Sequence, residues 1–336
     1  MDDTAILEVR DLRTHVTSDR GTVRAVDGVS FTVARGRTVG IVGESGCGKT
    51  MTALSIMGLL PKPQASIVGG EILFDGRDLT TLPPRELLEI RGRDIAMIFQ
   101  DPMTSLNPTL TVGTQIMETL RRHQGVTRAQ ARVRAAELLA EVGITDPARR
   151  LDDYPFQFSG GMRQRVMIAI AISCNPKLLV ADEPTTALDV TVQARILDLL
   201  HDLRDQHDMG LVLITHDMGV VADIADDTVV MYAGQIVEQA DVDELFARPE
   251  HPYTQALLRA MPSLQDDGGR NGRLAAIPGM PPSLVDPPAG CRFAPRCAFA
   301  DREDGCARGT NELRELRAGH WVRTTHPISA MAGVAS

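Results

Sequence analysis

The sequence has few aromatic residues and more acidic than basic ones, and both features disfavour the binding of nucleic acid. Aromatic residues make up only 4% of its 336 residues, and the formal net charge is −9. Single-stranded nucleic acid is bound largely by stacking on aromatic rings, and phosphate backbones favour a basic surface. We therefore expect no nucleic acid among the partners of this protein.

The sequence also lacks long apolar runs and an excess of cysteine. No run approaches eighteen apolar residues, so no segment is predicted to span a membrane. The first residues, MDDTAILEVR, do not show the basic and then apolar pattern of a secretion signal. We therefore expect the chain to stay in the cytosol, where it can dock on a membrane protein. In that compartment five cysteines are more typical of free, catalytic or metal-binding thiols than of disulfides.

Residues 38–60 have the pattern of a buried strand, a glycine-rich loop and a helix. The loop Gly43-Glu44-Ser45-Gly46-Cys47-Gly48-Lys49-Thr50 matches the P-loop pattern G-x-x-x-x-G-K-[ST]. In such a loop the backbone N–H groups converge on a phosphate, and the helix adds its positive N-terminal end. We expect Lys49 to reach the β- and γ-phosphates and Thr50 to ligate Mg²⁺. The alternative is a glycine-rich turn that matches by chance.

Strands and helices alternate along the chain, which predicts an α/β fold with a largely parallel sheet. Residues 6–33 form two alternating runs separated by the turn material THVTSDRGT, and they predict an antiparallel β subdomain with a further strand at 69–75. The other predicted elements are buried strands at 93–100, 177–183 and 210–215, a helix at 190–207 and a hairpin at 229–239.

A helical insertion is predicted over roughly residues 101–175, and an irregular region is predicted after residue 260. Within the insertion, Thr127 and Gln130 form a capping box. The residues expected on the buried face of the following helix are Val133, Leu138, Leu139 and Val142. The segment from 261 onward is dense in Pro and Gly, so we divide the chain into a domain of residues 1–260 and a small C-terminal domain of residues 261–336.

Polar residues end three of the predicted strands. Asp182 can hold Mg²⁺, and Glu183 can orient or deprotonate a water molecule. His216 can contact a γ-phosphate, because the carboxyl ends of parallel strands face the ligand crevice. Gln100 can ligate Mg²⁺ or the attacking water. The alternatives are a solvated acidic pair and a structural histidine.

A second anion site is predicted at Ser159-Gly160-Gly161-Met162-Arg163-Gln164. Ser159 can cap the helix that begins at the two glycines, whose N–H groups lie at the positive helix end. The segment falls in the helical insertion, so one domain can hardly close both sites on one phosphate. We therefore expect two domains to pair head to tail, each covering the other's ATP.

These segments together resemble the ATP-binding cassette of ABC transporters. The strings GESGCGKT, SGGMRQR, LLVADEP, TALD and ITHD occur in the order typical of the family, over about residues 5–260. The resemblance implies an ATPase with a P-loop core, in which the roles are Walker A for residues 43–50, Q-loop for Gln100, signature for residues 159–164, Walker B for Asp182, catalytic carboxylate for Glu183, D-loop for Asp189 and switch for His216. Phe158 replaces the leucine that usually begins the signature. The family's adenine-stacking aromatic residue is missing, and Arg20 is the candidate in its place.

The strings FQDPMTSLNP, RPEHPYTQALLRAMP and IPGMPPSLVDPPAGCRFAPRC resemble the dipeptide or oligopeptide importers. That resemblance implies ATP-driven peptide uptake at the cytoplasmic face of the membrane. The implied partners are a paralogous ATPase, two permeases and an extracytoplasmic binding protein. The alternatives are a nickel or glutathione importer, a non-transport cassette protein, and a regulatory cassette, which would be expected to lack Lys49 or Glu183.

The C-terminal region holds Cys291, Cys297 and Cys306, spaced C-x5-C-x8-C. In the subfamily that the chain resembles, four tail cysteines can hold a 4Fe–4S cluster. The fourth position is Thr324 here, so the set is incomplete. The open possibilities are a cluster completed by another ligand such as His320, another metal, or reduced structural thiols.

Overall fold

The computed structural model describes residues 5–101, 105–186, 188–261, 277–300, 306 and 311–332. The chain forms two compact units, each assembled from several segments. One unit contains Met1–Leu7, Val33–Thr38 and Phe74–Ile214, and the other contains Glu8–Thr32, Val39–Leu73 and Thr215–Ser336. Part of the irregular region predicted after residue 260, at 262–276, lies outside the described residues. Among those that are described, no helix is both long and apolar enough to cross a membrane.

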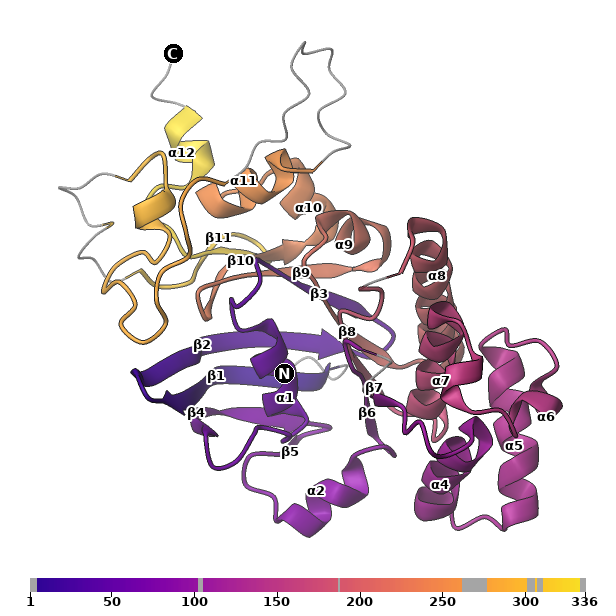
Figure 1. The fold of residues 1–336 in the computed structure, drawn as a ribbon. Helices are drawn as coiled ribbons and strands as arrows, with labels where there is room; N and C mark the ends of the chain where they lie inside the picture. Colours follow the sequence, from indigo (N-terminus) through magenta and orange to yellow (C-terminus); the bar gives the residue numbers. More distant parts are fainter. Residues whose placement is uncertain are drawn as a thin grey trace. The chain divides into compact units, whose positions relative to one another are not determined.

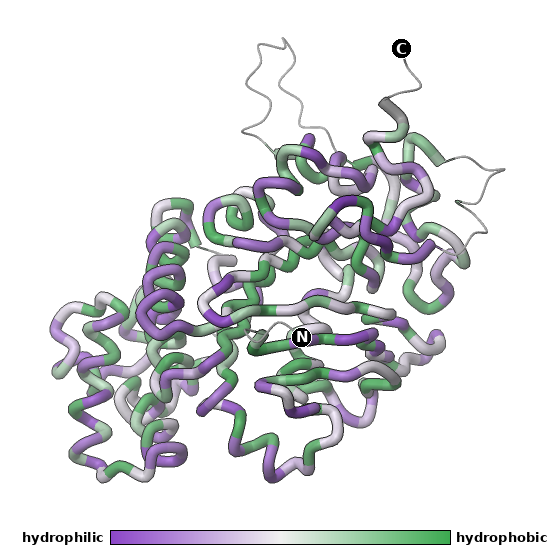
Figure 2. Tube along the Cα trace, turned by 180° about the vertical axis from the view of Figure 1, so that it is seen from behind, coloured by the Kyte–Doolittle hydropathy of each residue, from purple (hydrophilic) through white to green (hydrophobic). Residues whose placement is uncertain are grey.

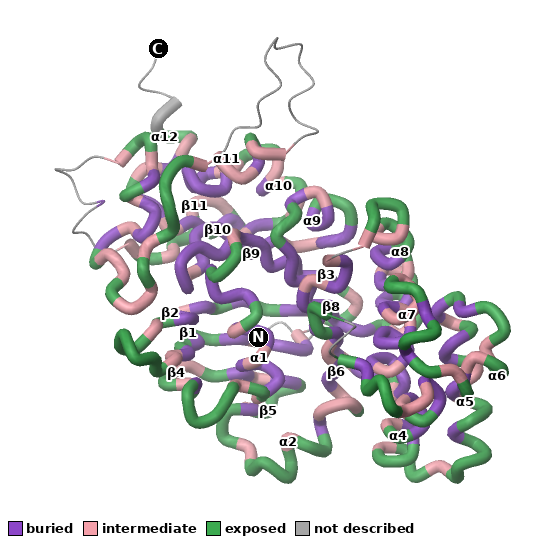
Figure 3. Tube along the Cα trace, in the orientation of Figure 1, coloured by how far each residue is buried: buried purple, intermediate pink, exposed green. Residues whose placement is uncertain are grey.

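The first unit contains three parallel strands, β6 (Ile95–Ile98), β7 (Leu178–Asp182) and β8 (Gly210–Thr215). In the register, Ile95 pairs with Leu178 and Leu178 pairs with Gly210. Every residue of β7 and β8 is buried (Figure 3). Continuous apolar runs of this kind suit strands that are covered on both faces. The three strands confirm the predictions at 93–100, 177–183 and 210–215, with shorter bounds at the first.

Helices form most of the rest of the first unit (Figure 1), and hydrophilic and hydrophobic residues alternate along them (Figure 2). Their bounds are α2 Pro84–Ile90, α4 Val112–Gln124, α5 Arg128–Glu141, α6 Pro147–Arg150, α7 Gly160–Ile172 and α8 Val190–His207, with a short strand, β5, at Arg77–Asp78 and a 3-10 turn, η1, at Pro155–Gln157. The helical insertion and the helix predicted at 190–207 are therefore present.

The capping box of α5 forms as predicted, but one residue assigned to the buried face of this helix was wrong. The N–H of Gln130 donates to Thr127 Oγ1 at 3.3 Å, and the N–H of Thr127 donates to Gln130 Oε1 at 3.0 Å. Val133 is 62% exposed, whereas Ala131 and Ala135 are fully buried. The buried stripe follows the spacing of three and four residues, and Val133 lies two positions from Ala131, on the opposite side of the helix. Packing geometry therefore overrides side-chain hydrophobicity here.

In the second unit, β1 (Ala5–Ser18) lies between β2 (Gly21–Ala34) and β4 (Ala65–Phe74). The predicted turn THVTSDRGT was too long, because β1 continues to Ser18 and β2 already starts at Gly21. Thr14 is buried within β1, and its hydroxyl is 2.8 Å from Ser55 Oγ. That buried bond explains why a polar stretch continues as a strand.

The P-loop strand β3 (Thr38–Val42) runs parallel to β9 (Asp227–Tyr232), which pairs antiparallel with β10 (Gln235–Asp241). The hairpin turn falls at Ala233 and Gly234, with φ values of 47° and 83°. Two positive φ values are characteristic of a type I′ turn. The predicted hairpin and its turn position are confirmed.

A C-terminal hairpin that the sequence analysis did not predict extends this sheet (Figure 1). β12 (His320–Val322) pairs with β10, and β11 (Arg314–Arg317) pairs with β12. His320 and Val322 are buried, whereas Trp321 between them is 38% exposed. The remaining helices of this unit are α1 Lys49–Ile56, α9 Met218–Ile224, α10 Val242–Ala247, α11 Pro252–Arg259 and α12 Ile328–Ala332, and a 3-10 turn, η3, spans Ala294–Arg296.

Candidate nucleotide-binding site

The P-loop joins β3 to α1. The helix begins at Lys49, directly after Gly48, whose φ of 110° lies in the left-handed region. A Cβ at Gly48 would come within 2.3 Å of the carbonyl oxygen of Ala25, and one at Gly43 within 2.2 Å of that of Met231. Only glycine fits at both positions, so the two ends of the loop are fixed by close backbone contact.

The side chain of Lys49 lies along the inside of the loop. Its buried Nζ donates to the carbonyl oxygens of Gly43 at 2.7 Å and Glu44 at 3.2 Å. Nζ also lies 4.0 Å from Cys47 Sγ, and burial raises the pKa of that thiol despite the nearby ammonium. The exposed residues of the loop are Ser45, Gly46 and Thr50. Exposed backbone beside a held cation is the arrangement that binds phosphate.

Tyr253, which the sequence analysis did not single out, supports the loop. The N–H of Glu44 donates to the Tyr253 hydroxyl at 2.9 Å, although the two residues are 209 positions apart in the sequence. Tyr253 is fully buried in α11, and burial raises the pKa of its phenol. A second bond runs from the N–H of Gly234 to the carbonyl oxygen of Cys47 at 2.8 Å. No local pattern could have revealed contacts over such sequence distances.

The acidic pair lies at the end of β7 in the first unit. Asp182 is 2% exposed and is the last residue of the strand. Glu183 follows with a φ of 48°, and its Oε2 accepts hydrogen bonds from Gln100 Nε2 at 3.0 Å and from Thr186 Oγ1 at 2.8 Å. A positive φ outside glycine is uncommon and occurs often at functional sites. The structure thus brings Gln100 and Glu183 together and adds Thr186, which the sequence analysis missed.

Ser159 caps α7 as predicted, because its Oγ accepts the N–H of Met162 at 3.3 Å. Gly160 and Gly161 form the first turn of this helix. Gln164 lies one turn further on and is only 1% exposed, and its Nε2 has no hydrogen-bond partner within the described part of the chain. The serine and glycines are therefore at the helix end, and the glutamine is in the interior.

Asp189 caps the neighbouring helix α8, since its carboxylate accepts the N–H of Val192 at 3.0 Å. A Cβ at Gly161 would come within 2.7 Å of Val192 Cγ1. The first turns of α7 and α8 therefore lie in close contact, and glycine permits this approach.

His216 and Arg20 both lie on exposed stretches of the second unit. His216 follows β8 and precedes Asp217, which caps α9 by accepting the N–H of Gly219 at 2.8 Å. Arg20 lies in the turn between β1 and β2. Their roles toward the phosphate and the adenine stay predictions.

None of the five cysteines, all of which the structure describes, forms a disulfide. Burial raises the pKa of the Cys291 and Cys297 thiols, which favours their protonated form. Cys306 is buried, and its Sγ lies 3.4 Å from Thr325 Oγ1. Across the described residues, no group of three or more His, Cys, Asp or Glu side chains could hold a metal ion.

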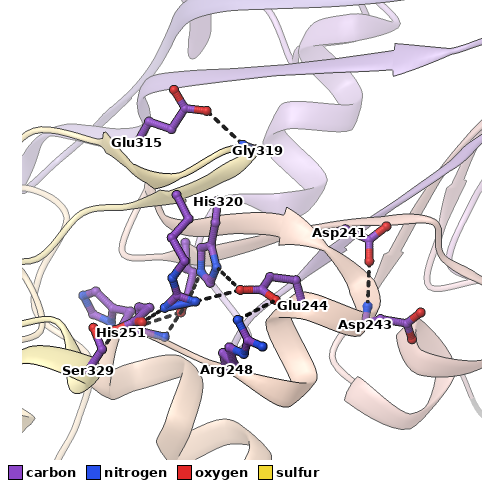
Figure 4. Close-up of polar contacts among 12 residues, drawn as sticks. Asp241, Asp243, Glu244, Arg248, His251, Glu315, Gly319, His320 and Ser329 are labelled. Atoms are coloured by element: carbon purple, nitrogen blue, oxygen red, sulfur yellow. Dashed lines mark hydrogen bonds and ion pairs between the residues drawn. The ribbon is translucent and has the colours of Figure 1, made fainter. Parts of the chain in front are cut away.

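The proposed replacement ligand for a cluster, His320, is held by carboxylates instead (Figure 4). Its Nε2 lies 2.8 Å from Glu238 Oε1, and its Nδ1 lies 3.5 Å from Glu244 Oε1. The fourth cysteine position is the buried Thr324, whose hydroxyl accepts the N–H of His326 at 3.1 Å. The tail residues that the structure describes therefore do not supply a complete ligand set for a 4Fe–4S cluster, which the resemblance leaves open.

Comparison with known proteins places the chain in a family. Residues 26–186 match the ABC transporter family, and residues 237–306 match the C-terminal region of oligopeptide/dipeptide transporters. The chain therefore belongs to the ATP-binding proteins of ABC transporters, in the oligopeptide/dipeptide branch. This confirms both the resemblance and the predicted P-loop α/β fold.

Individual relatives cover nearly the whole chain. It is 55% identical to the probable peptide ABC transporter ATP-binding protein y4tR of Sinorhizobium fredii, over 94% of this chain and 93% of that protein. It is 50% identical to the dipeptide transport ATP-binding protein DppD of Escherichia coli, over 96% and 97%. Its fold matches the dimeric ATP-binding cassette MJ0796 bound to ADP and Pi with a TM-score of 0.63 and 27% identity, over 70% of this chain and 98% of that one.

Proposed function

We propose that this chain is the ATP-binding and hydrolysing subunit of an ABC importer that energises the uptake of dipeptides or oligopeptides across the cytoplasmic membrane. The observation that carries the proposal is the P-loop, in which Lys49 is held by the carbonyl oxygens of Gly43 and Glu44 below an exposed backbone turn. The match of residues 237–306 to the oligopeptide/dipeptide transporter region supports the peptide cargo.

In this proposal, residues 43–50 bind the phosphates of ATP and Arg20 contacts the adenine. Mg²⁺ would be held by Thr50, Gln100 and Asp182, whose hydroxyl, amide and carboxylate oxygens are the donors that this ion prefers. The bound ion would neutralise charge on the phosphates. Gln100 donates through its Nε2 to Glu183, which leaves its amide oxygen available to the ion.

Glu183 is the proposed group that orients or deprotonates the attacking water, and His216 is the proposed sensor of the γ-phosphate. The hydrogen bonds from Gln100 and Thr186 fix one carboxylate oxygen of Glu183 in place. A fixed carboxylate is an efficient general base, because little reorganisation is needed when the proton moves.

The second nucleotide contact comes from a neighbouring ATPase subunit in this proposal. Ser159, Gly160, Gly161 and Asp189 of each subunit would cover the ATP bound by the other, whereas Gln164 of the same segment is buried. The exposed N-terminal turn of α7 supports this assignment, because a capped helix start presents N–H groups to an anion.

The proposed assembly contains a paralogous ATPase subunit, two permeases and an extracytoplasmic binding protein, and it places this chain peripherally at the cytoplasmic face. Residues 1–260 would form the nucleotide-binding domain, with the helical subdomain at about 101–175. Residues 261–336 would form the C-terminal extension. The names of the relatives, which describe peptide transport ATP-binding proteins, support this assembly.

The test is Glu183→Gln, assayed for ATP hydrolysis and for labelled dipeptide uptake in cells that carry the transporter genes. We expect turnover to fall by a factor of about 10² to 10⁴ while ATP binding is retained. Glu137→Gln is the matched control, because Glu137 is an exposed carboxylate paired with Arg134 on α5. Undiminished hydrolysis would contradict the catalytic assignment, and nickel uptake that depends on Glu183 while peptide uptake does not would overturn the cargo.

A further inference from the structure

Arg296, in the 3-10 turn η3, has an acceptor for every one of its five guanidinium N–H donors. Nη1 donates to Glu44 Oε2 at 2.5 Å and to the Tyr232 hydroxyl at 3.3 Å. Nη2 donates to Glu44 Oε1 at 2.9 Å and to the carbonyl oxygen of Ile277 at 3.3 Å, and Nε donates to that of Pro278 at 2.9 Å. A fully paired guanidinium is fixed in orientation.

The pair between Arg296 and Glu44 is shielded on the arginine side. The Arg296 side chain is 4% exposed and that of Glu44 is 26% exposed. The guanidinium lies 5.8 Å from the centre of the Tyr232 ring, and its bond to Glu44 raises the pKa of Arg296. Bidentate arginine–carboxylate pairs are directional, so the contact fixes the direction in which Glu44 leaves the loop.

Glu44 also supplies one of the two loop carbonyl oxygens that hold Lys49, the other being that of Gly43. The carbonyl oxygen of Glu44 accepts from Lys49 Nζ, and its N–H donates to Tyr253. One residue of the P-loop therefore connects the phosphate-binding lysine to two residues that follow it by more than 200 positions, Tyr253 and Arg296.

We propose that Arg296 is a positioning residue for the P-loop, which holds Glu44 in place and thereby sets the backbone that supports Lys49. The proposal rests on the proposed ATP binding by this loop. It gives the C-terminal region, which contains no part of the predicted nucleotide site, a direct effect on nucleotide affinity.

The chemistry requires arginine at this position. Lysine keeps the charge but carries three donors on one nitrogen, so it cannot bind both oxygens of Glu44 and both backbone carbonyls in the same geometry. Arg296→Lys therefore removes the bidentate hydrogen bonds to Glu44 while it keeps the positive charge. Glu44→Gln removes the charge from the partner and keeps its shape.

The experiment measures the Kd for MgATP of the purified full chain by calorimetry, and the KM and kcat for ATP hydrolysis of the transporter assembly that contains the same chain. The variants are Arg296→Lys, Glu44→Gln and the double variant. The matched control is Arg132→Lys, because Arg132 makes a bidentate pair with Asp152 at 2.9 and 2.7 Å on the exposed surface of the first unit. Thermal unfolding of each variant reports on folding.

We expect Arg296→Lys and Glu44→Gln each to raise the Kd and the KM for ATP about tenfold, which corresponds to about 1.4 kcal/mol. The double variant should be no worse than either single one, because both remove the same contact. The control should bind ATP like the wild type.

Four results would overturn the proposal. Wild-type affinity for ATP in both single variants would contradict the positioning role, and so would losses of affinity that add in the double variant. In either case ATP binding by the wild type would leave the proposed function intact. A lower kcat with unchanged Kd and KM would show a merely structural role. Failure of the wild type to bind ATP would overturn the proposed function and this inference together.

Discussion

The imidazole of His251 should make the folded protein sensitive to mild acid. His251 is the N-cap of α11 and is 1% exposed. Its Nδ1 accepts the N–H of Tyr253 at 3.0 Å, so the ring must be unprotonated at that nitrogen. Its Nε2 is buried and has no hydrogen-bond partner among the residues that the structure describes. Burial lowers the pKa of His251 to about 4, against the opposing effect of Glu238.

The sign and size of the effect follow from linkage. An unfolded histidine has a pKa of about 6.5, so between about pH 6.5 and pH 4 the unfolded chain binds a proton that the folded chain does not. The free energy of unfolding therefore falls as the pH drops through this interval. His251 alone should contribute a loss of about 2 kcal/mol between pH 7 and pH 5.

The assay is denaturant unfolding at pH 7 and pH 5, with wild type compared to His251→Asn. Asparagine can cap the helix by accepting the N–H of Tyr253, but it cannot be protonated in this range. The variant should therefore lose about 2 kcal/mol less than the wild type over this interval. His201→Asn is the control for the substitution itself, since His201 is an exposed histidine on α8. Parallel losses in wild type and His251→Asn would refute the reasoning.

Two further predictions concern the P-loop and the tail. Lys49→Ala should weaken ATP binding by about 10- to 100-fold, the range expected for a lost charge-assisted hydrogen bond. Lys177→Ala, which removes an exposed ion pair to Asp75, should leave affinity unchanged, and equal affinity in the two variants would remove the P-loop assignment. Protein purified without oxygen should show neither bound iron nor brown absorbance. Iron at the level of one cluster per chain would contradict the conclusion that the tail residues lack a complete set of cluster ligands.

Predictions of structure from the sequence are most reliable where function and local structure depend on the same residues. The P-loop needs Gly48 at a left-handed position and Lys49 at the helix start, and both requirements appear in eight consecutive letters. The cap formed by Ser159 and the hairpin turn at Ala233 and Gly234 are equally local. Each of these was predicted because the cause and the effect lie within a few residues.

Other features depend on contacts that no window of sequence contains. The strand β1 continues through Thr14 because that hydroxyl meets Ser55, and β12 exists because it pairs with β10. The burial of Ala131 in place of Val133 depends on which side of α5 meets its neighbours. Tertiary packing decides these cases, so periodicity and propensity alone could not.

The contact between Glu44 and Arg296 has a consequence for the synthesis of the protein. The two residues are 252 positions apart, so at the usual pace of synthesis roughly 10 to 50 s pass between the appearance of the first and the second. During that time the nascent chain already contains its glycine-rich loop and Lys49 but not the Arg296 guanidinium that bonds to Glu44. The contact to Glu44 thus forms late, and a chain released before residue 296 would contain residues 43–50, 159–164 and 216 but not the arginine that bonds to Glu44.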